Sequence, residues 1–170
     1  MYEWYTTKHE NVPFSEEKNM KVYESVVSDT LLQHFQEQRG RTLMNHAANS
    51  VGIEDTLAVS DVLWPTIVED DGHVFIADFY NKNLERLKAQ FHNDKRAIER
   101  QVNAWSLADF FLLASSPSVD SDVLITKFGE VLHFFWSLRL KTLFSGREFV
   151  VEVGEDIEGE RGLSITFYEK

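Results

Sequence analysis

The stretch VEDDGHV, from Val68 to Val74, gathers three carboxylates beside a glycine and a histidine. Side chains of these types could bind a hard cation or move a proton. Calcium loops, however, space their ligands at alternate positions and end with a distant bidentate glutamate. The carboxylates of Glu69, Asp70 and Asp71 are contiguous instead, so their side chains diverge, and we interpret the stretch as a polar turn rather than a metal site.

Glu130 and His133 form a second candidate pair, three residues apart in the stretch GEVLH. This spacing occurs in di-iron helical bundles, where a second Glu-x-x-His and further glutamates complete the site. The chain has no second pair of this kind, and we predict neither a metal nor a cofactor. His34 and His46 would approach each other if their helices packed antiparallel. These four residues carry an alternative hypothesis, an enzyme or small-molecule binder with a pocket beside a helix over 122–143.

The linear signatures of common enzyme classes are missing from the chain. It contains no G-x-S-x-G, no phosphate-binding glycine loop and no H-E-x-x-H. It also contains no cysteine, which excludes disulfides, thiolate metal sites and a cysteine nucleophile. Active sites are assembled in three dimensions, so enzyme activity stays open, but the survey favours a non-enzymatic protein.

The charge of the chain is strongly acidic, with a formal net charge of −11. No lysine or arginine occurs between Arg41 and Lys82, an interval that holds seven carboxylates. Nucleic acids and anionic membranes attract basic surfaces, so we predict neither as a partner. We expect instead an acidic surface that attracts a more basic protein, as a neutralising, adaptor or regulatory partner. The candidate contact residues are Glu54, Asp55, Asp61, Glu69, Asp70 and Asp71.

The length of 170 residues fits one globular domain over 1–170, with an irregular segment over 1–14. The N-terminus has neither the basic nor the apolar region of a signal peptide, and no run approaches the length of a membrane span. We therefore expect a soluble cytoplasmic protein.

Periodicity predicts helices in the first part of the chain and β-strands directly after Pro65. Helices are expected from Ser15 to Gly40, over 41–50 and over 53–64. The runs TIV and HVFIADF flank Asp-Gly, a strong signal for a β-hairpin. Two helices should follow, the first capped by Asn83 and the second, which should carry Ile98, Val102 and Trp105, by Asn93 or Asp94.

The C-terminal half contains the long helix predicted over 122–143 and a second hairpin over 149–168. Two apolar faces on the long helix indicate that it is central, and we expect Phe135 to be buried on one of them. The predicted fold is α+β, with the two hairpins joined in one antiparallel sheet packed on the long helix.

Aromatic residues are abundant, with 13 Phe and 4 Trp. A single small core requires fewer, so some of them should line an apolar pocket or an exposed interaction patch. In its acidity, its lack of cysteine and its combination of hairpins with helices, the chain resembles small bacterial immunity proteins, which block basic toxins. The resemblance is one of overall character, since no motif is specific to that family, and it implies a basic protein as partner.

Overall fold

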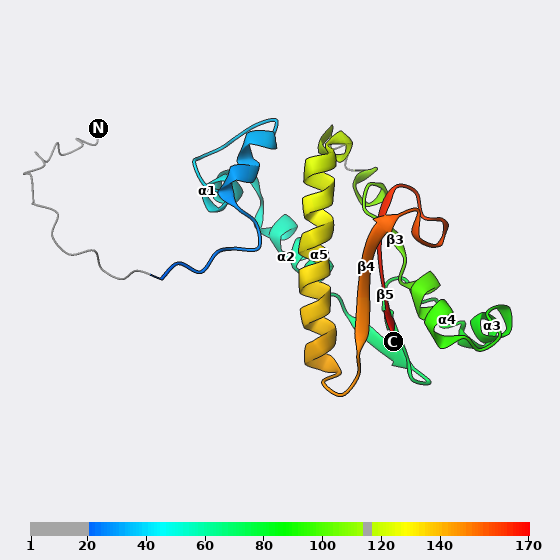
Figure 1. The fold of residues 1–170 in the computed structure, drawn as a ribbon. Coiled ribbons are helices and arrows are strands. Elements are labelled where there is room, and N and C mark those ends of the chain that lie inside the picture. Colours follow the sequence, from blue (N-terminus) through cyan, green and yellow to red (C-terminus); the bar gives the residue numbers. More distant parts are fainter. Residues whose placement is uncertain (1–20, 114–116) are drawn as a thin grey trace, which may run out of the picture.

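The long helix α5 (Asp122–Leu143) and a C-terminal hairpin of β4 (Phe149–Glu155) and β5 (Leu163–Glu169) form the centre of the protein. The computed structural model describes residues 21–113 and 117–170. Figure 1 shows α5 on one side of the hairpin and α4 (Lys95–Val102) on the other side. The N-terminal elements lie beyond α5, away from the strands, so the layers follow one another as N-terminal helices, α5, sheet and α4.

The remaining elements are short. They are the 3₁₀ helix η1 (Asp29–His34), α1 (Leu43–Ser50), α2 (Ile53–Leu63), β1 (Ile67–Asp70), β2 (His73–Ile76), α3 (Leu84–Gln90), β3 (Trp105–Ser106), and the 3₁₀ helices η2 (Asp109–Phe111), η3 (Pro117–Asp120) and η4 (Ile157–Gly159). The fold is α+β, as predicted. The long helix agrees with its predicted bounds and is capped by Ser121, whose hydroxyl accepts from the backbone N–H of Leu124.

The prediction that the two hairpins join in one sheet is wrong. β1 and β2 form a two-stranded antiparallel sheet, and β3, β5 and β4 form a separate one in that order. Trp105 was expected on the helix that begins after Asp94. It lies instead in β3, where it pairs with Ile165 of β5, because the chain leaves α4 at Asn103. The hairpins are nevertheless held together, by side chains rather than by a backbone ladder.

Two buried polar side chains make that connection, one from α4 and one from the C-cap residue that follows it. One carboxylate oxygen of Glu99 accepts from the backbone N–H of Val74 in β2 (2.9 Å), and the other accepts from the N–H of Glu169 in β5 (2.7 Å). One turn later, the amide oxygen of Asn103 accepts from the N–H of Ile76 (2.9 Å). Its amide nitrogen donates to the carbonyl of Val74 and to a carbonyl of β5 (3.0 and 3.2 Å). We call Glu99 and Asn103 the α4 clamp.

The α4 clamp has no solvent exposure at either residue. Its bonds therefore form in a low-dielectric interior, where an unmade hydrogen bond would be expensive. Burial raises the pKa of the Glu99 carboxyl, while the two backbone N–H groups and Lys95 oppose that shift. The clamp replaces the missing ladder between β2 and β5, so both hairpins depend on α4.

The larger of the two apolar core clusters lies between α5 and the strands. Leu132, Trp136 and Leu140 of α5 are fully buried and pack with residues of β2, β4 and β5. Phe135, expected on the buried face, is only half-buried, and Leu138 on the same face is exposed. The other predicted apolar face of the helix is therefore the one that forms the core.

The helix predicted from Ser15 to Gly40 is wrong for its described part. Its predicted start lies outside the described residues, 21–28 form no regular element, and only η1 is helical. The hydroxyl of Ser25 accepts from the N–H of Val27, and that of Ser28 accepts from the N–H of Thr30. Such local side-chain bonds to the backbone compete with an α-helix.

Arg147, in the loop between α5 and β4, joins three parts of the fold. Its guanidinium donates to both carboxylate oxygens of Glu169 in β5 (2.9 and 2.7 Å). It also donates to the carboxylate of Glu69 in β1 (2.7 Å) and to the carbonyl of Gly72 (2.9 Å). The ring of Phe149 lies 5.2 Å from the guanidinium carbon. The first hairpin is thus fixed to the end of the second one.

Replacement of Asn103 should test the α4 clamp. Asn103→Ala leaves the N–H of Ile76 and the carbonyls of Val74 and Phe167 without this partner, so we expect a loss of about 2–5 kcal/mol in the free energy of unfolding. Gln101→Ala, two residues earlier on the same helix, should change it by less than about 1 kcal/mol. Urea denaturation measures both, and equal effects of the two substitutions would contradict the clamp.

Acid should weaken the junction at Glu169. The bonds from Arg147, followed by that from Lys95, lower the pKa of the Glu169 carboxyl to about 2 from an ordinary value of 4.5. Its stabilisation is therefore present above about pH 4.5 and is lost as the pH falls toward 2. Glu169→Gln should remove roughly 1–3 kcal/mol at pH 7 and flatten the pH dependence of stability in that window.

Glu148→Gln is the matched control for this pH series. Glu148 pairs with Lys170 at 3.2 Å, and both side chains are largely exposed. Its substitution should leave the pH dependence between 2 and 4.5 unchanged, because exposed pairs contribute little. If Glu169→Gln and Glu148→Gln give the same curve as the original protein, the junction at Glu169 does not govern acid stability.

Candidate functional site

The carboxylates of VEDDGHV lie on the β1–β2 hairpin and have partners inside the protein. Glu69 binds the Arg147 guanidinium, as described above. Asp70 accepts from the hydroxyl of Tyr80 at 2.5 Å, and Asp71 forms an ion pair with Lys88 of α3 at 2.6 Å. The three side chains therefore diverge to three different parts of the chain, as expected from contiguous positions.

The electrostatics of the hairpin agree with this pairing. The hydrogen bond and charge of Lys88 lower the pKa of the Asp71 carboxyl. Burial, reinforced by the bond to Asp70, raises the pKa of Tyr80 to about 12. Asp71 and Gly72 have φ values of 46° and 76°, which confirms a turn with two left-handed residues. The stretch is a turn whose acidic side chains hold the hairpin in place.

Glu54, Asp55 and Asp61 have a different environment. They lie on α2, and all three are exposed. Among the residues that the structure describes, none of the three forms an ion pair. The six candidate contact residues thus divide into a hairpin group with internal partners and a helical group that faces solvent.

An apolar stripe accompanies the acidic residues of α2. Ile53, Leu57 and Asp61 follow at steps of four, and Glu54 lies beside this stripe, so the four residues share one side of the helix. Ile53 and Leu57 are 78% and 66% exposed. We call Ile53, Glu54, Leu57 and Asp61 the α2 face. It combines apolar surface with negative charge at the surface of the protein.

The search for acidic residues in the sequence missed the apolar part of this face. The signal was present, because apolar residues occur around most of the circumference of α2. Val62 and Leu63 pack against the core, while Ile53 and Leu57 lie on another side of the helix. A helix that is apolar on several sides but packs on one must leave large side chains exposed.

Glu130 and His133 line a groove between α5 and β4, with a volume of about 600 Å³. Both are exposed. Glu130 forms an ion pair with Lys127, and Glu152, which also lines the groove, forms one with Arg100 at 3.0 Å. The Arg100 side chain lowers the pKa of the Glu152 carboxyl. Both carboxylates of the groove therefore already form ion pairs within the protein.

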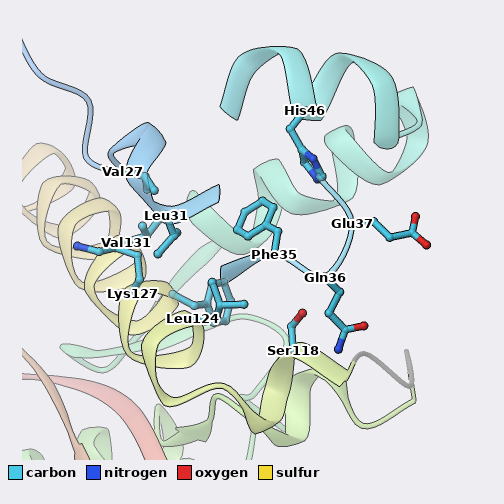
Figure 2. Close-up of a pocket in the computed structure, with 11 residues that line it drawn as sticks. Val27, Leu31, Phe35, Gln36, Glu37, His46, Ser118, Leu124, Lys127 and Val131 are labelled. Carbon is cyan, nitrogen blue, oxygen red and sulfur yellow. The ribbon is translucent and has the colours of Figure 1, made fainter. Parts of the chain in front are cut away.

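His46 lines a different cavity, of about 520 Å³, between the η1 segment and α5. Figure 2 shows it above an apolar group that includes Leu31, Phe35 and Leu124. Its Nδ1 accepts from the backbone N–H of Arg39 at 3.1 Å. His34, at the end of η1, lines neither this cavity nor the groove. The structure thus divides the four residues of the alternative hypothesis among separate surfaces.

The described part of the chain holds no cluster of three His, Asp or Glu side chains that could bind a metal ion. Within residues 21–113 and 117–170, no helix has the length and apolar composition needed to cross a membrane. Comparison with protein-family models, curated proteins and solved structures finds no match to this chain.

The hairpin turn provides a test that separates structural from contact roles. Gly72→Val should destabilise the protein by about 1–2 kcal/mol, because a β-branched residue is strained at positive φ. No heavy atom lies within 4 Å of a Cβ added there, so strain alone is expected. Asp71→Asn should have a smaller effect, since Asn also adopts the left-handed conformation. Thermal unfolding compares the two.

Partner binding by the variants Asp70→Asn and Asp71→Asn is measured alongside stability. Both variants should retain binding if these carboxylates serve the hairpin. Loss of binding with unchanged unfolding midpoints would instead assign the hairpin tip to the contact surface.

Proposed function

We propose that this protein is a non-enzymatic acidic domain that binds a more basic protein through the α2 face. The observation that carries the proposal is the exposed pair Ile53 and Leu57 beside carboxylates that no described cation neutralises. Interfaces combine an apolar centre with a polar rim, and contiguous exposed apolar residues mark such surfaces.

Charge supports a basic partner. The α2 carboxylates Glu54, Asp55 and Asp61 remain available, whereas those of the hairpin already bind arginine, lysine or tyrosine within the protein. Unpaired surface charges steer an oppositely charged protein toward the docking site and increase its association rate. The apolar stripe would then supply the contact area that charge alone does not.

The architecture of α2 suits such a role. None of its residues is buried, so a partner can cover the helix without unfolding the core. The helix is still anchored at its C-terminal end, where the indole N–H of Trp136 donates to the carbonyl of Val62 at 3.0 Å. Its position relative to α5 is therefore set before a partner arrives, which reduces the ordering that binding requires.

The test removes three negative charges from α2. A variant with Glu54→Gln, Asp55→Asn and Asp61→Asn should bind the partner at least about tenfold more slowly at low salt. The difference should shrink as salt screens the charges. Proteins from cells that make this chain are captured on the immobilised protein at low and high salt and identified, and the association rate of the retained basic protein is then measured.

The matched control removes the same charge elsewhere. Asp120→Asn, Glu148→Gln and Glu155→Gln alter exposed carboxylates outside α2, so capture should persist. Equal losses in both triple variants would show that net charge rather than the α2 face is recognised. If no basic protein is retained at either ionic strength, the proposed function is wrong.

A further inference from the structure

A small aromatic cavity opens beside the C-terminal end of α2. Its volume is about 240 Å³, and its lining includes Asp61, Asp78, Phe79, Trp105, Phe110 and Trp136. Typical small-molecule sites are roughly 300–1,000 Å³, so this one fits a single side chain better than a whole cofactor. It shares Asp61 with the α2 face, so an occupant could reach both at once.

The rings form walls in different planes. Phe110 meets Trp105 edge-on, with centroids 4.7 Å apart and planes at 84°. Phe79 is tilted against Trp105 by 59° at 5.5 Å, and Trp136 is stacked on Trp105 at 6.2 Å. Phe110 is 39% exposed, so the cavity is open to solvent on that side. The face of an aromatic ring attracts a cation through the ring quadrupole, so an aromatic lining suits a positively charged side chain.

Both charged side chains in the lining of the cavity are carboxylates. Asp61 and Asp78 supply carboxylates, which only accept hydrogen bonds when ionised. The indole N–H of Trp136 is already bound to the backbone of α2. The two carboxylates therefore favour a ligand that supplies hydrogen-bond donors and a positive charge.

No described cation of the protein fills this role. The arginines that lie over aromatic rings in the described residues use Trp64, Phe144, Phe149 and Tyr168, none of which lines the cavity. Neither Asp61 nor Asp78 has an ion pair among residues 21–113 and 117–170. The site is complementary to a charge that the described chain does not provide.

We propose that this cavity receives the head group of one arginine or lysine side chain presented by the protein partner. The aromatic walls would contact the aliphatic stem and the cationic head, while the two carboxylates accept its hydrogen bonds. The inference rests on the proposed function for the origin of that side chain. The cavity would add one specific contact to the α2 face, which by charge alone would not distinguish between basic partners.

The test uses isolated side-chain analogues, so that it does not require the partner. The probes are the Nα-acetyl methylamides of arginine and lysine, with those of citrulline and norleucine as neutral counterparts. Binding is followed by NMR through the indole N–H of Trp105, assigned with Trp105→Phe. We expect at least one basic probe to bind about fivefold or more tightly than its neutral counterpart, with the pair showing whether arginine or lysine is preferred.

Substitutions at the rim supply the matched comparison. Asp78→Asn should weaken binding of the preferred basic probe by about three- to tenfold. Glu54→Gln removes the same charge from α2 but lies outside the cavity lining, so its effect should be less than about twofold. Thermal unfolding of each variant checks that the fold is retained, and the comparison of charged with neutral probes on the unaltered protein does not depend on any variant.

Any one of three results would overturn the inference. The charged and neutral probes bind equally, the Trp105 signal does not shift, or Asp78→Asn and Glu54→Gln have equal effects. These results are separable from the proposed function. Capture of a basic partner that survives Asp78→Asn would leave the α2 face standing while the cavity fails. Probe binding without any captured partner would support a cavity that accepts basic side chains, while the proposed binding through the α2 face fails.

Discussion

The α4 clamp is the interaction on which the arrangement of this protein depends. β2 and β5 come close without forming a ladder, and Glu99 and Asn103 satisfy the backbone groups that a neighbouring strand would otherwise bind. Both side chains are fully buried, so the bonds cannot be replaced by water without opening the interior. Because β2 also carries Ile76 into the main core, the clamp sets the place of the whole first hairpin.

The acidic side chains of the first hairpin and of α2 form two groups that are distinguished by their neighbours. On the hairpin, Glu69, Asp70 and Asp71 hold β1 and β2 against Arg147, Tyr80 and Lys88. On α2, the carboxylates face solvent next to exposed apolar residues. The first group stabilises the fold, while the second leaves negative charge available to a partner. A net charge alone could not separate these roles, because it counts paired and unpaired carboxylates equally.

The core and the proposed binding region share residues. Trp136 is buried against the sheet, holds the end of α2 through its indole N–H, and forms part of the aromatic cavity. Trp105 belongs to β3 and is fixed by pairing with β5. Both tryptophans of the cavity are thus carried by regular elements, which position a binding site more rigidly than a loop does, whereas Phe79 lies in the turn after β2.

Local sequence determined the elements whose signals lie within a few residues. Asp-Gly between two β-branched runs gave the hairpin, and Ser121 with the apolar repeat that follows gave the long helix. Tertiary structure decided what depends on distant partners. Whether Asp70 and Asp71 are free or paired depends on Tyr80 and Lys88, which periodicity cannot place. The joining of the hairpins was mispredicted because a clamp of side chains from α4 can replace a backbone ladder, and nothing local in Glu99 or Asn103 reveals it. The meeting of Asp61, Asp78 and the aromatic rings likewise follows from the packing of α2, the turn after β2, β3, η2 and α5, since these residues come from separate parts of the chain.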